Sequence, residues 1–316
     1  MRRFVRLKQM APSRKAHSTS STSPAITVRD NRWLKRFRAA LGGDRADGDP
    51  VGVEGVRLVE AALGSRLRVE ALLVSDSGER HLARVASLLE NGAQILRTSD
   101  RLFAGVTDTQ SPQGIAALVE PRKTTIETLL CGSELIVVLA GVQDPGNVGT
   151  ILRAAEALGA TGAAACALGS IGTADPLGPK ALRASAGSAL RLPFVQGIPL
   201  AGLISKFRNA RVKIYAAVAA QQPRDTERRG ESLILRPWEA DWKSQVALLI
   251  GNEGAGLPED VARSADARIC IPLAASSTPI GVESLNAAMA ATVLLYEAMR
   301  QRRALDESGA GSTCSS

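Results

Sequence analysis

Three glycine-punctuated polar loops carry the side chains of this 316-residue chain that could do chemistry. The first loop, residues 141–160, contains the turn sequence D-P-G-N, in which Asn147 is placed to open a following helix, and Arg153 comes six residues later. A helix N-terminus with an arginine close by can bind an anion or a ribose phosphate. A helix cap beside an ordinary surface arginine explains the same pattern, so this loop alone leaves both interpretations open.

The second loop, residues 251–261, reads GNEGAGLPEDV. Three glycines in six positions would let a ligand lie against bare backbone, and Glu253 adds one carboxylate. The G-x-G-x-x-G pattern of dinucleotide-binding folds is not matched, because Pro258 and Glu259 stand where the third glycine belongs. No G-x-x-x-x-G-K-[ST] string occurs in the sequence either. Rossmann-type cofactor binding and P-loop nucleotide hydrolysis are therefore disfavoured.

The third loop follows a short predicted strand at residues 268–271 and leads into Ser284-Leu285-Asn286, which opens the last helix. Ser284 on its own is explained equally well as the N-cap of that helix. The helix is expected over residues 285–302 and carries an apolar stripe at helical spacing. The stripe consists of Leu285, Met289, Thr292, Tyr296 and Met299. We expect it to pack on the sheet or on a second subunit.

Uninterrupted apolar runs precede these loops, as expected for parallel strands that are buried on both faces. They lie at residues 135–140, 163–167, 212–218 and 246–250, with helix-like segments between them. Such alternation predicts a mostly parallel sheet sandwiched by helices. Ligands in open α/β sheets bind at the carboxyl ends of the strands, where the polar loops begin.

A smaller alternating α/β unit precedes this block. Helices are predicted at 31–40, 54–63 and 81–90, and strands at 69–74, 94–98 and 115–119. The polar segment after Pro121 breaks the pattern, so we place a linker there. The predicted organisation is a basic flexible extension (1–24), a small α/β domain (25–121), a linker (122–132), a larger α/β domain (133–303) and a flexible polar tail (304–316).

Composition agrees with an α/β architecture and excludes several classes of protein. Apolar residues make up 45% of the chain and aromatic residues only 3%, so the core must be built mainly from Ala, Val, Leu and Ile. The four cysteines lie far apart and only two histidines occur, which argues against a zinc site or a disulfide scaffold and for a reducing compartment. We expect no metal and no membrane span.

Basic residues are concentrated at the N-terminus. Residues 1–40 contain eleven Lys or Arg and a single acid, Asp30. Such a block could bind a polyanion or could be a solvated tail, and the composition does not separate the two. Residues 1–24 also have the Arg-rich, acid-free composition of a mitochondrial transit peptide. We favour a cytoplasmic protein with an unstructured extension over this mitochondrial alternative.

Together, the three loops resemble the signature motifs of the SpoU (TrmH) family of RNA ribose 2'-O-methyltransferases, within the SPOUT superfamily. The matching segments are D-P-G-N-V-G-x-x-x-R at 144–153, I-G-N-E-G-x-G-L at 250–257, and I-P-L with V-E-S-L-N between 271 and 286. Residues 179–194, PKALRASAGSALRLPF, are also similar to the family. Residues 51–120 resemble the L30e-like substrate-binding domain that many members carry.

The resemblance implies a SPOUT domain that ends in a C-terminal trefoil knot, a homodimer with active sites at the subunit interface, and S-adenosylmethionine as the cofactor. It implies catalytic roles for Asn147, Arg153, Glu253, Ser284 and Asn286. It implies that Gly251, Ile271, Leu273 and Leu285 hold the cofactor, largely through backbone groups. Residues 274–281 are longer than the usual family connection.

The implied activity is methyl transfer to a ribose 2'-hydroxyl of RNA, with 23S-type ribosomal RNA favoured over transfer RNA as the substrate. In that reaction Arg153 would stabilise negative charge, because a guanidinium with a pKa above about 12 is a poor base. Asn147, Ser284 and Asn286 would orient the ribose, and Glu253 would hold Arg153 or a neighbouring group. The alternatives are a noncatalytic RNA-binding or ribosome-assembly factor, a tRNA 2'-O-methyltransferase, and a methyltransferase that acts on a base.

Overall fold

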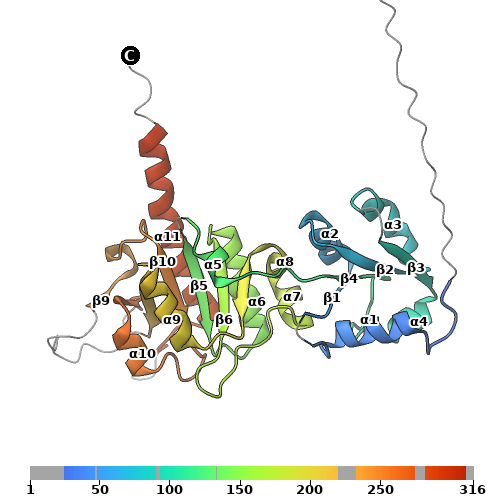
Figure 1. Ribbon diagram of the computed structural model, residues 1–316, viewed down its shortest axis with the longest axis horizontal. Helices are drawn as coiled ribbons and strands as arrows, with labels where there is room; N and C mark the ends of the chain where they lie inside the picture. The colour runs from blue at the N-terminus through green and yellow to red at the C-terminus, as the bar shows by residue number, and fades with distance from the viewer. Residues whose placement is uncertain are drawn as a thin grey trace, which may run out of the picture.

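The computed structural model describes residues 25–46, 48–89, 93–132, 134–219, 233–274 and 282–310. Two α/β units follow one another along the chain, each with its own sheet (Figure 1). The predicted basic extension, all but the first residue of the 274–281 loop and the end of the predicted tail lie outside the described residues.

The first unit has a four-stranded sheet in the order β1-β4-β2-β3, in which only β2 and β3 are parallel. Helices α1 and α4 cover one face, and α2 and α3 cover the other (Figure 1). Its elements are α1 (Arg32–Gly42), β1 (Val51–Glu54), α2 (Val56–Gly64), β2 (Val69–Ser75), α3 (Glu79–Ala86), β3 (Gln94–Thr98), α4 (Asp100–Ala104) and β4 (Ile115–Val119).

Strand β1 and helix α4 are absent from the sequence-based assignment. The assignment started a helix at Glu54, whereas the structure ends a strand there and begins α2 at Val56. Gly55 separates the two elements with φ of 90°, a value that favours glycine, and Gln113 Oε1 accepts a hydrogen bond from Val56 N at 2.9 Å. The boundary therefore depends on a side chain far away in the sequence, which local periodicity does not reveal.

The second unit has a seven-stranded sheet in the order β7-β6-β5-β10-β8-β11-β9, with every pair parallel. The predicted α/β architecture with a mostly parallel sheet is confirmed, although β7 and β9 were not predicted. Its elements are α5 (Ile126–Leu129), β5 (Leu135–Ala140), α6 (Pro145–Ala157), β6 (Gly162–Cys166), α7 (Pro179–Ser185), α8 (Ser188–Arg191), β7 (Phe194–Gln196), α9 (Leu200–Asn209), β8 (Lys213–Val218), β9 (Leu233–Leu235), the 3-10 turn η1 (Pro237–Glu239), β10 (Val246–Ile250), α10 (Glu259–Ser264), β11 (Ala267–Cys270) and α11 (Ala287–Ala310).

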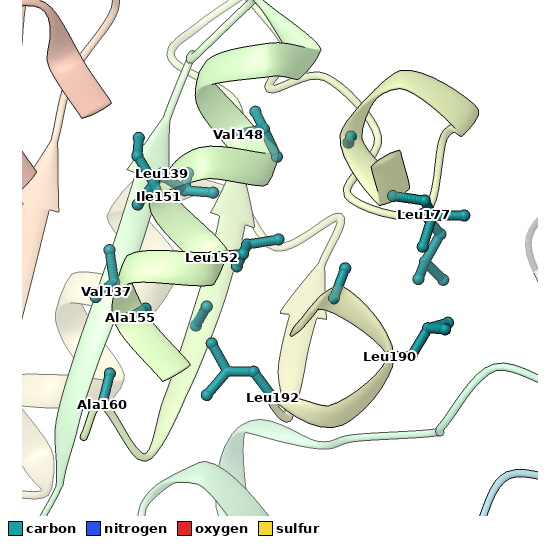
Figure 2. Packing of buried hydrophobic residues seen from close by; sticks show 14 of the residues in the cluster. Val137, Leu139, Val148, Ile151, Leu152, Ala155, Ala160, Leu177, Leu190 and Leu192 are labelled. Carbon is teal, nitrogen blue, oxygen red and sulfur yellow. The ribbon is translucent and has the colours of Figure 1, made fainter. Parts of the chain in front are cut away.

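Helices bury both faces of this sheet. Val137 and Leu139 of β5 point toward α6, where they meet Val148, Ile151 and Leu152 (Figure 2). The alternate residues of β5 belong to a second core that includes α5, α9 and α10. Successive side chains of a strand face opposite sides of its sheet, so a strand covered on both sides must be apolar at every position.

Helix α11 turns its leucines and several alanines to the core and leaves part of the predicted apolar stripe exposed. Leu294 and Leu295 are fully buried, whereas Met289 and Tyr296 are 57% and 55% exposed. The stripe was expected to pack on the sheet or on a second subunit. Packing on the sheet of the same subunit is therefore excluded for Met289 and Tyr296. The helix continues to Ala310, beyond the predicted end near residue 302.

The two units contact each other directly. Arg45 Nη2 of the first unit forms an ion pair with Asp175 Oδ2 of the second at 2.8 Å. The predicted linker contains α5, whose Ile126 and Leu129 are buried against the second sheet.

The predicted knot depends on the path through residues 275–281, so it stays a prediction. Within the described ranges, no helix is long and apolar enough to cross a membrane.

Candidate active site

The three polar loops meet at the carboxyl ends of β5, β10 and β11. Glu253, in the loop after β10, makes the central contacts: its carboxylate accepts hydrogen bonds from Gln143 N at 3.1 Å and from Asp144 N at 3.0 Å. It also accepts one from Asn147 Nδ2 at 3.0 Å. The Glu253 carboxylate therefore connects the second motif to two parts of the first motif, the loop before α6 and the first turn of α6.

Asn286 connects the third motif to the same network. Its Nδ2 donates to Asn147 Oδ1 at 3.1 Å, and its Oδ1 accepts from Ala288 N at 2.9 Å at the start of α11. Because Asn147 Nδ2 donates to Glu253, the hydrogen bonds run in one direction, from Asn286 through Asn147 to the carboxylate. The network fixes the orientation of both amide groups, so the three motifs hold each other in place.

The helix caps differ from the sequence-based interpretation. Asp144, not Asn147, caps α6, since its Oδ1 accepts from Gly146 N at 3.1 Å and Pro145 occupies the first helical position. Proline is preferred at that position, which makes the residue before it the cap. Asn286, not Ser284, caps α11. Asn147 and Ser284 are therefore free of the capping roles that would have explained their presence.

Asp144 is itself held by a cation from α7. Lys180 Nζ lies 2.7 Å from Asp144 Oδ1, and this hydrogen bond is the main reason that the pKa of Asp144 is lowered. Partial burial acts to raise the pKa of Glu253, but the hydrogen bonds from Asn147 and the backbone outweigh it and leave that pKa lowered. Both carboxylates are thus stabilised in the ionised form at neutral pH.

A cavity of about 340 Å³ adjoins this network. Its walls include Gly251, Ile271, Leu273 and Leu285, the four residues expected to hold the cofactor. Glu253 and Ser284 also line it, so the structure brings six of the nine predicted site residues to one cavity, and hydrogen bonds join Asn147 and Asn286 to them. The remaining predicted residue, Arg153, is not part of it.

Sequence reasoning missed part of the cavity wall. Ala217, Val218 and Ala219, at and just after the carboxyl end of β8, line the cavity opposite the glycine-rich loop. They contribute apolar surface and backbone groups only. The rule that parallel strands end at the same edge of a sheet could have located them once β8 was placed beside β10.

The glycine-rich loop is shaped by its own amide contacts. Asn252 Oδ1 accepts hydrogen bonds from Gly254 N and Ala255 N, both at 3.0 Å, and Asn252 Nδ2 donates to Gly141 O at 3.0 Å. The loop therefore folds back on itself and is attached to the end of β5. It presents mainly backbone to the cavity, which suits a flat ligand that is recognised by backbone groups.

Arg153 stands apart from the network within one subunit. It follows Asn147 by six residues on α6, which places it about 9 Å farther along the helix axis. The side chain is exposed and, among the described residues, makes no hydrogen bond or ion pair. Of the two roles expected for Glu253, holding Arg153 or holding a neighbouring group, the structure shows the second, with Asn147 as that group.

No group of three or more His, Cys, Asp or Glu side chains that could hold a metal ion occurs in the part of the chain that the structure describes. The polar side-chain groups shared by this network and the cavity are the Glu253 carboxylate, the Asn147 and Asn286 amides and the Ser284 hydroxyl. This set is suited to orienting hydroxyl groups and a positively charged ligand.

Comparison with known proteins assigns the class that this fold and site define. The SpoU rRNA methylase family matches residues 134–296, and the MRM3-like substrate binding domain matches residues 44–117. The chain belongs to the SpoU rRNA methylase family, as the motifs predicted.

Individual relatives resemble the chain over most of its length. It is 34% identical to the 23S rRNA (guanosine(2553)-2'-O)-methyltransferase RlmP of Bacillus subtilis, over 77% of this chain and 86% of that one. It is 32% identical to a 23S rRNA (uridine(2479)-2'-O)-methyltransferase of Streptomyces viridochromogenes, over 91% and 96%. The crystal structure of the SpoU methyltransferase AviRb from the same organism, in complex with AdoMet, superposes with a TM-score of 0.70 at 28% identity, covering 86% of this chain and 98% of that one.

Proposed function

We propose that this protein transfers a methyl group from S-adenosylmethionine to a ribose 2'-hydroxyl of ribosomal RNA. The observation that carries the proposal is the meeting of the three motifs at one cavity, joined through Glu253, Asn147 and Asn286. Relatives that match most of the chain are named as 23S rRNA 2'-O-methyltransferases. The first unit, which matches a substrate-binding domain, would hold the RNA.

The cavity suits S-adenosylmethionine in shape and chemistry. Ile271, Leu273 and Leu285 provide apolar contacts for a flat base, and Gly251 contributes backbone to the same wall. The Glu253 carboxylate at the wall favours a positively charged ligand. When bound, the cofactor supplies an electrophilic methyl group on a sulfonium.

The residues around the cavity would position the ribose and stabilise charge. Asn147, Ser284 and Asn286 orient the sugar so that its 2'-oxygen lies in line with the methyl group, as a displacement reaction requires. A ribose hydroxyl is a poor acid, so the developing negative charge on oxygen needs a nearby cation. Arg153 supplies it by electrostatic stabilisation, and Glu253 acts by holding Asn147.

The protein would act as a homodimer in which Arg153 works across the subunit interface. The exposed apolar side chains Leu285, Met289, Val293 and Tyr296 lie at the start and along one side of α11, next to the cavity. A contiguous apolar face of this kind is typical of an interface between subunits. A dimer formed there would cover the cavity mouth and bring a second α6 close to it.

Introducing charge on this face is expected to separate the subunits. The double variant Met289→Asp, Tyr296→Asp would bury two carboxylates from each subunit if the dimer forms. This costs several kcal/mol, so the protein should become monomeric and lose methyl transfer. Sedimentation velocity measures the change. Val28→Asp, at a side chain that is 60% exposed in the first unit, is the matched control and should stay dimeric. A double variant that remains dimeric would exclude α11 as the interface.

Ribosomal RNA is the proposed substrate in preference to transfer RNA, and the cytoplasm the proposed location. Two observations support ribosomal RNA as the substrate: the match to an rRNA methylase family and the bacterial relatives that are named as 23S rRNA methyltransferases.

Calorimetric titration with S-adenosylmethionine tests the proposal against a noncatalytic scaffold. An enzyme of this class should bind one cofactor per subunit with micromolar affinity, about −8 kcal/mol. A protein that only binds RNA has no reason to bind S-adenosylmethionine. The absence of measurable heat, checked by equilibrium dialysis, would therefore favour the scaffold interpretation.

A further inference from the structure

A second cavity, of about 210 Å³, lies between the two units on the side where α7 approaches β1 and α1 (Figure 1). The first unit contributes two acids, Glu54 and Asp108, together with Thr109 and Gln113, and the second contributes Leu182 and Arg183. Sites for drug-sized ligands measure roughly 300–1,000 Å³, so this one suits a single planar group. It exists only where the two units meet.

The polar groups of this cavity are incompletely paired. Glu54 Oε2 accepts a hydrogen bond from Thr109 Oγ1 at 2.8 Å, which leaves the other carboxylate oxygen available. Burial raises the pKa of Glu54, and the positive charge of Arg183 nearby partly opposes this effect. The side chain of Arg183 is exposed and, among the described residues, its guanidinium has no hydrogen-bond or ion-pair partner. The cavity thus offers an acceptor and a cationic donor to a ligand.

Apolar surfaces complete the cavity. Leu58 of α2 and Leu182 of α7 belong to the continuous core of the two units and also line the cavity. Gly52 and Gly55 line it as well and contribute backbone only. Aliphatic walls with polar groups at the edge are the arrangement that holds a planar heterocycle by stacking on its face and hydrogen-bonding its edge.

The position of the cavity relates it to the candidate active site. Pro179 lines the cavity, and the next residue, Lys180, pairs with Asp144 at the cap of α6. Three residues, or one turn of α7, separate Lys180 from Arg183, about 4.5 Å along the helix. An RNA strand whose ribose lies at the network of Glu253 therefore has a second contact point within reach of a neighbouring nucleotide.

We propose that this cavity between the units binds an unstacked guanine base of the substrate RNA, with Glu54 and Arg183 reading its edges. The 2-amino group of guanine donates to the carboxylate together with its ring N–H, and O6 and N7 accept from the guanidinium. Adenine places an acceptor opposite the carboxylate, and cytosine offers a single amino donor. The inference rests on the proposed function, because it takes RNA as the substrate.

Binding of short RNAs tests the proposal directly. The probes are fluorescein-labelled heptamers, UUUGUUU, UUUAUUU, UUUCUUU and UUUUUUU, titrated with the full chain at low salt and followed by anisotropy. We expect the guanine heptamer to bind at least about tenfold more tightly than the others. The variants Glu54→Gln and Arg183→Ala should each abolish this preference. Glu70→Gln, at a partly buried carboxylate paired with Arg36 in the first unit, should keep it.

The outcomes are separable from those of the proposed function. Equal affinity for all four heptamers, a preference for another base, or a guanine preference that survives Glu54→Gln would overturn the proposal. Calorimetry with S-adenosylmethionine on the same samples reports on the cofactor site, so the guanine site can fail while the enzyme assignment stands. Thermal melting verifies folding; Glu54→Gln should melt no lower than the parent, because burial disfavours the ionised carboxylate.

Discussion

Replacing Arg153 with alanine is expected to lower methyl transfer by at least about 100-fold, while cofactor binding stays within twofold of the parent. The guanidinium is exposed and makes no contact with the cavity of its own subunit, so its removal leaves the pocket intact. Loss of a group that stabilises charge in the transition state lowers turnover by about 10²- to 10³-fold. Single-turnover methylation with radiolabelled cofactor measures the first quantity, and calorimetry measures the second.

Lys243→Ala is the matched control for this variant. Lys243 is also exposed and cationic, but it precedes β10, at the amino ends of the strands and away from the candidate site. Both substitutions should change the free energy of unfolding by no more than about 0.5 kcal/mol, as is usual for surface positions. Unchanged turnover in Arg153→Ala would remove this residue from the mechanism.

Replacing Gly251 with alanine is expected to weaken cofactor binding at least about tenfold, or about 1.4 kcal/mol. A Cβ at this position would lie 2.5 Å from Leu257 N and 2.7 Å from Gly256 O. Both neighbours are backbone atoms of the same loop, so relief of the clash must move the cavity wall. Calorimetric titration of the variant with S-adenosylmethionine gives the change.

Gly254→Ala is the control for this substitution. It adds the same methyl group to the same loop, yet the nearest atom to its Cβ is Asn252 Oδ1 at 3.6 Å, an ordinary van der Waals contact. The loss of affinity should therefore be much smaller than for Gly251→Ala. Equal losses in the two variants would show that the clash at Gly251 does not determine the shape of the pocket.

Mixing the Arg153→Ala and Gly251→Ala variants, at a cofactor concentration too low to fill the weakened pocket, tests whether Arg153 acts across the subunit interface. In a heterodimer of Arg153→Ala and Gly251→Ala subunits, the first contributes an intact pocket and the second an intact arginine. If the arginine acts on the other subunit's pocket, the mixture should recover activity above the sum of the separate samples. If it acts within its own subunit, both sites of the heterodimer are defective and no recovery occurs.

The parallel sheet could be predicted from the sequence because a strand buried on both faces has a distinctive composition. Residues 135–140 and 246–250 are apolar at every position, and both were placed as strands with the bounds that the structure shows. Strands β7 and β9 are three residues long at the edges of the sheet, too short for periodicity to mark them. Edge strands need fewer apolar residues, so their sequences resemble loops.

The candidate site was predictable by residue identity and much less by geometry. Motif resemblance selected Glu253 and Asn147 for the same site, and the structure joins them by a hydrogen bond between residues 106 positions apart. The helix caps are Asp144 and Asn286, whereas the sequence offered Asn147 and Ser284 as the candidates. The preferences of Asn, Asp and Ser for caps overlap, so only the surrounding contacts decide. The cavity between the two units was invisible to motif analysis, since neither unit contains it alone.

The central claim is that the cavity beside Glu253 presents a methyl donor to a sugar oxygen of RNA. Its most direct measurement is incubation of unmodified 23S rRNA with the protein and methyl-labelled S-adenosylmethionine, followed by nuclease digestion and mass spectrometry of the nucleosides. We predict one labelled nucleoside that carries one added methyl group on its ribose, with a yield at least about 100-fold lower for Arg153→Ala. Label on a base, or no label in RNA despite cofactor binding, would contradict the account.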